Sequence, residues 1–154
     1  MGICFSKNVI SKKYINKHDD YSKLNYFSFN NCKTLAKVVD VYDGDTCSIV
    51  FFINKQIIKY KCRMLGYDSP EMKPLKTIEN RNEIIEKAKI SRDFFISLLK
   101  ESDFIVDIKM GKFDKYGRIL ATVYNSDNIS INQIMISEGH GYPYTGGTKC
   151  KITY

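Results

Sequence analysis

The sequence predicts a single α+β domain in which β-strands predominate. Its 154 residues are enough to bury one core, and a content of 44% hydrophobic and 13% aromatic residues is typical of a globular protein. Short stretches rich in β-branched and aromatic residues predict strands, and two further stretches have the apolar spacing of helices. The predicted order is three strands, a helix, two strands and a helix.

The first three predicted strands are joined by short turns. A strand over 35–42 is followed by the turn residues Asp43-Gly44, and a second strand spans 46–53. Asn54-Lys55 then leads into a third strand over 57–65. Because the later two strands are rich in β-branched and aromatic residues and their connection is short, they are expected to form a hairpin.

The second half of the chain alternates between helices and strands. Its expected elements are a loop over 72–80, a helix over 83–100, strands over 103–110 and 119–124, a helix over 131–138 that ends at Gly139, and a loop over 141–147. The order matches an OB-type barrel, a five-stranded Greek-key barrel with a helix between strands three and four. A parallel sheet fits less well, because the first three strands lack helical crossovers. We therefore expect an OB-type barrel with two to three helices.

The chain is basic, with a formal net charge of +7 from 24 Lys and Arg against 17 Asp and Glu. This balance favours anionic partners, either nucleic acid or an anionic membrane surface. Arginine occurs only at 63, 81, 92 and 118. A guanidinium grips two phosphate oxygens at once, whereas lysine acts as a point charge. The arginines at 63 and 118 lie inside acidic motifs and are therefore informative.

The N-terminus carries a lipidation pattern. Gly2 and Ser6 fit the Met-Gly-x-x-x-Ser/Thr signal for N-myristoylation. One myristoyl chain anchors weakly, so a second signal is expected, and Cys4 is placed for palmitoylation beside lysines that would face anionic lipid. A plain tail with an accidental Gly2 is the alternative. Residues 1–33 are expected to form an acylated basic anchor and tether on the cytoplasmic side of a membrane, ahead of a domain over 34–154.

Cysteine usage and hydropathy agree with an intracellular location. Five cysteines, at positions 4, 32, 47, 62 and 150, form no CxxC pair and no metal spacing. Together with the absence of a secretory signal, they predict reduced thiols in a cytosol. No apolar run approaches about 18 residues, so the sequence predicts no membrane-spanning helix.

Two acidic motifs predict a site for a hard divalent cation. Asp43-Gly44-Asp45 alone also fits a common hairpin turn, and Asp68-Ser69-Pro70-Glu71 alone fits a capped turn. Asp45 and Asp68, however, each lie at a strand end, where a barrel could bring them together. Carboxylates that meet repel each other unless a cation lies between them, and oxygen ligands suit calcium or another hard divalent ion.

The residues after Asp68 add a candidate for activating water. Pro70 biases Ser69 towards an extended conformation. That conformation can turn the Ser69 carbonyl towards the ion and bring Glu71 back to the same side. Glu71 is therefore a candidate to hold or deprotonate a water molecule.

Two arginines are candidates for binding a phosphate. Arg63 lies on the strand that leads to Asp68, and Arg118 begins the strand after Lys115-Tyr116-Gly117. Singly, each arginine fits a surface ion pair, but together they could clamp one phosphate and stabilise charge at a five-coordinate phosphoryl centre. Lys115 and Tyr116 could bind a neighbouring phosphate and stack on a base.

Taken together, Asp43-Gly44-Asp45-Thr46, Arg63-x4-Asp68-Ser69-Pro70-Glu71 and Asp114-Lys115-Tyr116-Gly117-Arg118 resemble the staphylococcal nuclease (thermonuclease) family over about residues 35–141. The resemblance implies an OB-type barrel and calcium-dependent hydrolysis of DNA and RNA to 3′-phosphate ends. By matched position it implies calcium ligands at Asp45, Asp68 and the Ser69 carbonyl with Asp43 in support, a water-orienting or general-base Glu71, a phosphate clamp of Arg63 and Arg118, and nucleotide contacts at Lys115 and Tyr116. Serine at 69 stands where the family's prototype has threonine.

Three functions are compatible with these motifs. The first is a monomeric, membrane-tethered, metal-dependent nuclease. The second is a barrel that keeps the fold, lacks the chemistry and binds nucleic acid or protein at a membrane, and the third is a membrane adaptor with a vestigial barrel. The charged set is complete at Arg63, Asp68, Glu71 and Arg118, which favours the nuclease because function is argued from the site rather than from the fold.

Overall fold

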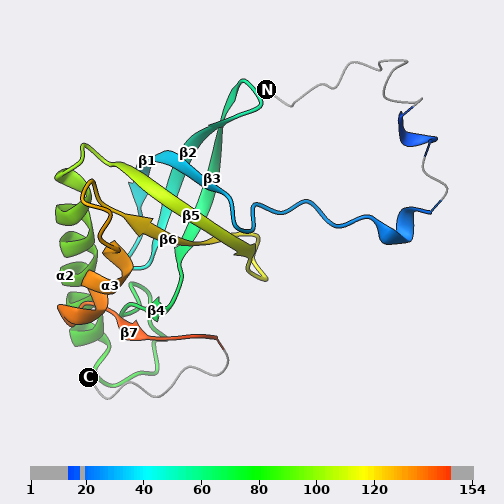
Figure 1. The fold of residues 1–154 in the computed structure, drawn as a ribbon. Coiled ribbons are helices and arrows are strands. Elements are labelled where there is room, and N and C mark those ends of the chain that lie inside the picture. Colours follow the sequence, from blue (N-terminus) through cyan, green and yellow to red (C-terminus); the bar gives the residue numbers. More distant parts are fainter. Residues whose placement is uncertain (1–13, 18–19, 147–154) are drawn as a thin grey trace.

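A closed five-stranded barrel forms the centre of the computed structural model, which describes residues 14–17 and 20–146 (Figure 1). Its strands are β1 (Lys33–Val41), β2 (Thr46–Ile53), β3 (Gln56–Met64), β5 (Ile105–Phe113) and β6 (Ile119–Tyr124). They neighbour one another in the order β1-β2-β3-β6-β5, with only β3 and β6 parallel among these barrel pairs. The predicted five-stranded OB-type barrel is confirmed.

Strand β5 differs most from its predicted bounds. It begins at Ile105 because Asp103 and Phe104 have φ values of 51° and 61°, which no strand residue adopts. It ends at Phe113 rather than at Met110 because the pairing with β6 shifts register and resumes at Phe113 and Ile119. The polar loop after β5 therefore begins three residues later in the chain than predicted, after Phe113 and not after Met110.

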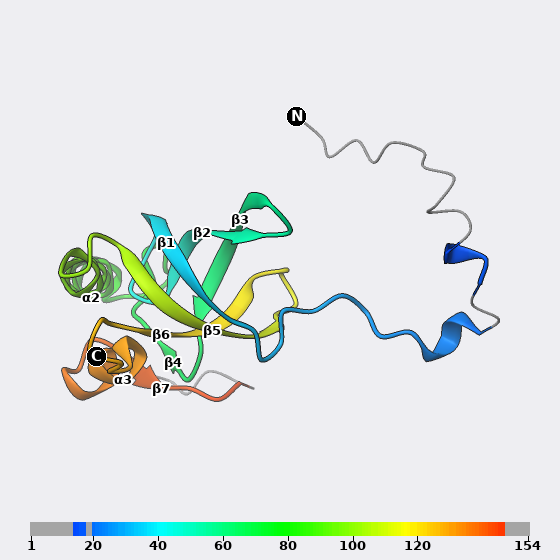
Figure 2. The same cartoon turned by 45° about the horizontal axis from the view of Figure 1, so that its top comes forward.

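Two helices cover one side of the barrel in both views (Figures 1 and 2). Helix α2 (Arg81–Lys100) buries Ile84, Ala88, Phe95 and Leu99, the apolar face that its spacing predicts. Helix α3 (Ile131–Ser137) begins at Ser130, whose side chain accepts a hydrogen bond from the Gln133 amide. It ends as predicted before Gly139, whose φ of 75° suits glycine.

A second, two-stranded sheet was not predicted. It pairs β4 (Tyr67–Asp68) with β7 (Tyr142–Pro143), and the sequence analysis expected only a loop over 141–147. Two residues are too few for an alternating pattern, so this pairing depends on tertiary contacts. The sheet holds the residues before Ser69 against the end of the chain that the structure describes.

The N-terminal segment is attached to the barrel by a buried ring and by backbone hydrogen bonds from the Asn31 amide to the Met110 carbonyl and from the Met110 amide to the Cys32 carbonyl, each over 2.8 Å. Phe29 is 3% exposed and packs edge-to-face on Phe51, Tyr60 and Phe113. It precedes residue 34, where the sequence analysis placed the start of the domain. Residues 20–28, including the short 3₁₀ helix η1 (Tyr21–Lys23), lead away from the barrel (Figures 1 and 2).

The lipidation candidates Gly2 and Cys4 lie outside the described residues. Within the described part of the chain, no helix is both long and apolar enough to cross a bilayer.

Candidate active site

The predicted site residues converge at one end of the barrel. Thr46, the first residue of β2, lies directly opposite Arg63 on β3, and the Asp45 carbonyl accepts a hydrogen bond from the Met64 amide over 2.8 Å. This pairing places the turn between β1 and β2 beside the chain that leads into β4. Sequence positions about 20 residues apart therefore meet because β2 and β3 form a hairpin.

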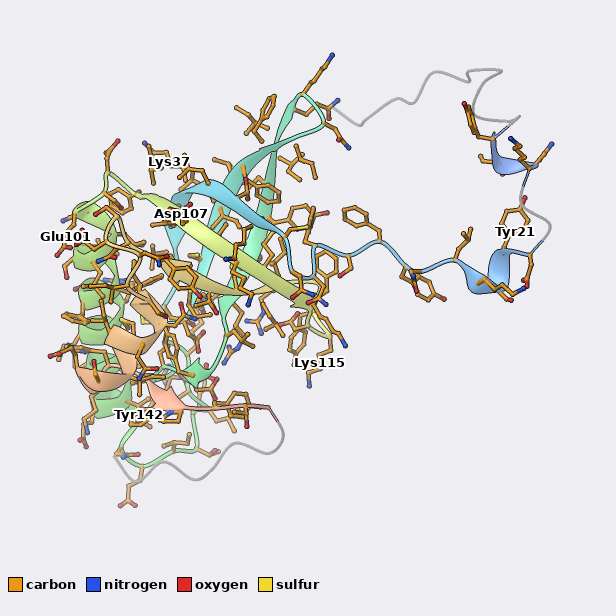
Figure 3. The ribbon with its side chains drawn as sticks, in the orientation of Figure 1. Tyr21, Lys37, Glu101, Asp107, Lys115 and Tyr142 are labelled. Carbon is orange, nitrogen blue, oxygen red and sulfur yellow. The ribbon has the colours of Figure 1, made fainter. Side chains whose placement is uncertain are left out.

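A cavity of about 740 Å³ opens at this end. Among the residues that line it are eight of the candidates: Asp43, Asp45, Arg63, Ser69, Glu71, Lys115, Tyr116 and Arg118. Asp68 is buried behind the lining and reaches the cavity through its ion pair with Arg63. Figure 3 labels Lys115 on the loop between β5 and β6 and Tyr142 on β7.

Arg63 joins two of the predicted metal ligands. Its Nη1 and Nη2 atoms each lie 3.1 Å from an oxygen of Asp45, and Nη2 also forms an ion pair with Asp68 Oδ1. The Arg63 side chain is 15% exposed, and each of the two carboxylates is 4% exposed. A buried bidentate pair of this kind is held firmly, since separating it would leave a charge without solvent or partner.

Asp45 has further donors on the opposite side. The Ser69 amide donates to its Oδ2 atom over 3.0 Å, and the Thr46 hydroxyl donates to Oδ1 over 2.8 Å. Arg118 Nη1 approaches the same hydroxyl to 3.5 Å. Both arginines therefore meet at Asp45, one directly and one through Thr46, a residue to which the sequence analysis assigned no role.

Asp43 differs from Asp45 and Asp68 because no arginine offsets its negative charge among the described residues. It is buried, and its Oδ1 atom accepts a hydrogen bond from the Asp45 amide over 3.0 Å. Burial, followed by the negative charge of Asp45, raises the pKa of Asp43 to about 7. No ion pair to Asp43 occurs within residues 14–17 and 20–146. A nearby cation would favour its ionised form.

Arg118 is oriented by Asp114. The carboxylate accepts from the backbone amides of Tyr116 and Arg118, each over 2.9 Å, and from Arg118 Nε over 2.6 Å. Although burial acts to raise the pKa of Asp114, these hydrogen bonds from Arg118 and Tyr116 hold it below its ordinary value. Asp114 belongs to the motif on which the resemblance depends, but its orienting role was missed because a turn aspartate has many structural uses.

The loop of Asp114 also presents an exposed aromatic ring. The Tyr116 side chain is 72% exposed, with Lys115 Nζ at 5.1 Å and the Arg118 guanidinium carbon at 5.4 Å from its ring centroid. A ring between positive groups at a cavity rim is suited to stacking on a base beside a phosphate.

Tight packing supports the Asp43-Gly44-Asp45 turn from below. The Tyr67 hydroxyl donates to the Gly44 carbonyl over 2.7 Å, and a Cβ atom on Gly44 would meet the Ser91 hydroxyl and approach Ser69 Cβ to 2.8 Å. Only glycine fits here without displacing its neighbours. Neither Tyr67 nor Ser91 was a candidate in the sequence analysis, since both act on the turn from elements distant in sequence.

The acidic residues fit a hard divalent cation in charge and in donor chemistry. Asp43, Asp45, Asp68 and Ser69 offer only oxygen atoms, and the buried Asp43 carboxyl has no cationic partner among the described residues. The same residues are not arranged as a finished ligand cage: the described part of the chain holds no group of three or more His, Cys, Asp or Glu side chains in coordinating positions. Arg63 instead forms ion pairs with both Asp45 and Asp68.

The sequence is similar to known proteins. A family model described as staphylococcal nuclease homologue matches residues 61–151. An uncharacterized endonuclease of Escherichia coli is 29% identical over 109 residues, and one of Escherichia coli O157:H7 is 28% identical over 109 residues. Each match covers 71% of this chain and 60% of the relative, so the chain spans less than two thirds of the curated proteins that it resembles.

Proposed function

The chain belongs to the staphylococcal nuclease family, and we propose that it is a calcium-dependent nuclease that hydrolyses phosphodiester bonds of DNA and RNA. One observation carries this proposal: Arg63 on β3 and Arg118 in the loop before β6 approach the same buried acidic cluster, in a cavity that Glu71 also lines. The carboxylates of this cavity would repel an anionic substrate unless a bound cation offset their charge.

Asp43, Asp45, Asp68 and Ser69 would hold the calcium ion. When bound, the ion supplies a Lewis acid that neutralises the scissile phosphate. The Asp45 carboxylate is held by the Ser69 amide as well as by Arg63, and the Asp68 backbone is held in β4.

The two arginines bind the phosphate. Arg118 is preorganised by Asp114, so it loses little freedom when it takes up a phosphate oxygen. Arg63 forms ion pairs with Asp45 and Asp68 in the absence of a cation. Once a cation binds these two carboxylates, Arg63 would turn towards the substrate phosphate. Two guanidinium groups then face the charge that grows on the equatorial oxygens as water attacks.

Glu71 serves the attacking water. Its side chain is exposed and lies in the cavity lining, after the turn that begins at Asp68. An ionised carboxylate there orients a water molecule and accepts its proton, and Lys115 with Tyr116 would hold the neighbouring nucleotide.

Cleavage of single-stranded DNA and RNA by the purified full chain tests this function, with calcium and with a chelator. Glu71→Gln should lower the rate by about 100- to 10,000-fold without loss of substrate binding. Glu79→Gln is the matched control, because Glu79 is another exposed acid of the same loop region. A folded protein that binds DNA but cleaves nothing with any divalent ion would leave a docking barrel as the better account.

The same proposal places the nuclease at a membrane. Residues 1–33 act as an acylated basic tether through Gly2 and Cys4, on the cytoplasmic side, and a monomeric barrel over 34–154 carries the activity. Metabolic labelling with a myristate analogue, beside Gly2→Ala, tests the tether independently of cleavage.

A further inference from the structure

The hairpin of β2 and β3 projects beyond the rest of the barrel, with its tip away from the candidate active site (Figure 1). Between Thr46 and Met64 it contains Lys55, Lys59, Lys61 and Arg63, and no aspartate or glutamate. Its tip is the Asn54-Lys55 turn, with φ values of 47° and 64°. Lys61 and Arg63 line the active-site cavity, so Lys55 and Lys59 are the cations of the hairpin nearest the tip. With no carboxylate on the hairpin beside them, the tip is a candidate contact for an anionic surface.

Two large apolar side chains are exposed next to each other on this hairpin. Phe52 and Ile57 are directly opposite in the β2–β3 register and are 66% and 73% exposed. Ala36 on β1 pairs with Phe51 on β2, and both are buried. The next position in this antiparallel register places Leu35 opposite Phe52 on the outward face, where Leu35 is 58% exposed. An apolar row that crosses three strands in water marks a contact surface more often than isolated exposed residues do.

Lysines border this apolar row. Lys37 and Lys59 both pair with Val50, so they form the adjacent outward row, and Lys55 lies at the turn. Lys37 is 3.4 Å from Asp103, with both side chains largely exposed. On the other side, Asp107 pairs with Leu35 and limits the basic surface; Figure 3 labels it beside Lys37.

We propose that the β2–β3 hairpin inserts its tip into the anionic face of a lipid bilayer, an inference that rests on the proposed membrane location of this nuclease. Phe52 and Ile57 enter the boundary between headgroups and acyl chains, while Lys55 and Lys59 meet anionic headgroups. Aliphatic Ile57 and Leu35 have no counterpart in a base-stacking surface, which favours lipid over nucleic acid as the occupant.

The position of the hairpin agrees with this occupant. Phe29, the last anchored residue of the N-terminal segment, packs on Phe51 and Tyr60 of the same hairpin, with ring centroids 5.4 Å apart in each case. Because Phe29 also packs on Phe113 of β5, this contact does not by itself orient the barrel, but a lipid anchor on that segment would keep the hairpin within reach of the bilayer. The Thr46–Arg63 pair is seven residues from the tip, or roughly 23 Å along the strand, so the cavity stays open to nucleic acid.

Tryptophan fluorescence tests the insertion directly, because the chain has no tryptophan of its own. Phe52→Trp in the unacylated full chain is mixed with phosphatidylcholine vesicles, either pure or containing about 30% phosphatidylserine. The expected result is a blue shift with the anionic vesicles and quenching by brominated acyl chains. Leu75→Trp is the control, since Leu75 is 73% exposed on a loop elsewhere and its emission should not change.

Vesicle affinity provides a second arm. Phe52→Ser with Ile57→Ser should weaken binding to anionic vesicles by about tenfold or more, and Lys55→Gln with Lys59→Gln should weaken it about fivefold or more. The basic N-terminal segment is present in every variant, so the comparison isolates the hairpin. Leu75→Ser and Lys76→Gln, both at exposed positions, should bind like the unmodified chain.

Any of three results would overturn the inference. The Phe52→Trp emission could stay unshifted with anionic vesicles, or the double serine variant could bind vesicles as tightly as the unmodified chain. The emission could also shift with single-stranded DNA and not with vesicles. The last result would assign the hairpin to nucleic acid. Both arms are read without cleavage, so failure of the nuclease proposal and failure of this one remain distinguishable.

Discussion

The hydroxyl of Tyr67 donates a hydrogen bond to the backbone carbonyl of Gly44 over 2.7 Å, with both residues buried. Gly44 separates Asp43 from Asp45, so this bond fixes the peptide that joins two candidate metal ligands. Tyr67 itself is held in β4, which pairs with β7, and its ring packs against Gly141 so closely that a Cβ there would clash. The short second sheet is thereby connected to the acidic turn.

Tyr67→Phe should destabilise the domain by about 1–3 kcal/mol, because the Gly44 carbonyl would remain buried without its donor. Urea unfolding measures this change. Tyr26→Phe is the control, since Tyr26 is 98% exposed and its loss of a hydroxyl should leave the unfolding free energy within about 0.5 kcal/mol. Equal stability of the two variants would show that the Gly44 carbonyl finds another donor.

Asp114→Asn should reduce cleavage by about tenfold or more, because the amide nitrogen of asparagine cannot accept the hydrogen bond from Arg118 Nε. The variant retains one acceptor oxygen for the backbone amides, so the fold should persist. Steady-state kinetics on single-stranded DNA, with circular dichroism as a check of folding, measures the effect.

Asp93→Asn provides the matched control for this experiment. Asp93 also accepts two hydrogen bonds from an arginine, at 3.0 and 2.8 Å from Arg92, but on the exposed side of α2. Its loss should leave kcat/KM unchanged. A similar loss in both variants would mean that Asp114 acts only through general stability.

Asp43→Asn should stabilise the protein in a chelator, by about 1–2 kcal/mol at mildly alkaline pH. The substitution removes a buried negative charge beside Asp45, while the asparagine oxygen can still accept the Asp45 amide. Addition of calcium should stabilise the unmodified chain more than the variant, because the ion compensates the charge that the variant lacks. Thermal unfolding of both proteins, beside the exposed Asp127→Asn, decides the matter; a less stable Asp43→Asn in chelator would contradict it.

The barrel could be predicted from the sequence because its signals are local. The predicted bounds of β2 and β6 match the structure, since strong runs of β-branched and aromatic residues end abruptly at turn residues. The meeting of Asp45 with Asp68 was also expected, because each lies at the end of a predicted strand and a barrel can bring such ends together.

Features that depend on distant contacts could not be predicted. The partner of Tyr67 is a backbone carbonyl 23 positions away on a glycine, which carries no side-chain signal. The aromatic residues at 14, 21, 26, 27 and 29 indicated that part of the N-terminal stretch packs on the domain, but the sequence did not show that Phe29 is the one buried in the core while its sequence neighbours are exposed. Arg63 forms ion pairs with the carboxylates that the sequence analysis assigned to calcium, a choice that only the assembled site reveals.

Asn132 holds helix α3 to the barrel. Its substitution should therefore lower the free energy of unfolding more than substitution of an exposed neighbour in α3 does. Its side-chain oxygen accepts from the Val123 amide over 2.9 Å, and its nitrogen donates to the carbonyls of Leu65 and Ala121 over 2.8 and 3.0 Å. Because Asn132 is 4% exposed, alanine would leave the Val123 amide and the Leu65 carbonyl without their partners, whereas the Ala121 carbonyl keeps the Leu65 amide at 2.7 Å. The expected cost is about 2 kcal/mol or more in unfolding free energy.

Gln133→Ala tests whether this cost is specific to Asn132. Gln133 is the next residue of α3 but is exposed, so alanine there should change stability by less than about 0.5 kcal/mol. Hydrogen exchange should show faster opening at Val123 and Leu65 in Asn132→Ala alone, since these residues lose contact with α3. Because Leu65 precedes β4 and the Asp68 turn, cleavage should fall with the loss of local order; intact exchange protection would refute this role of Asn132.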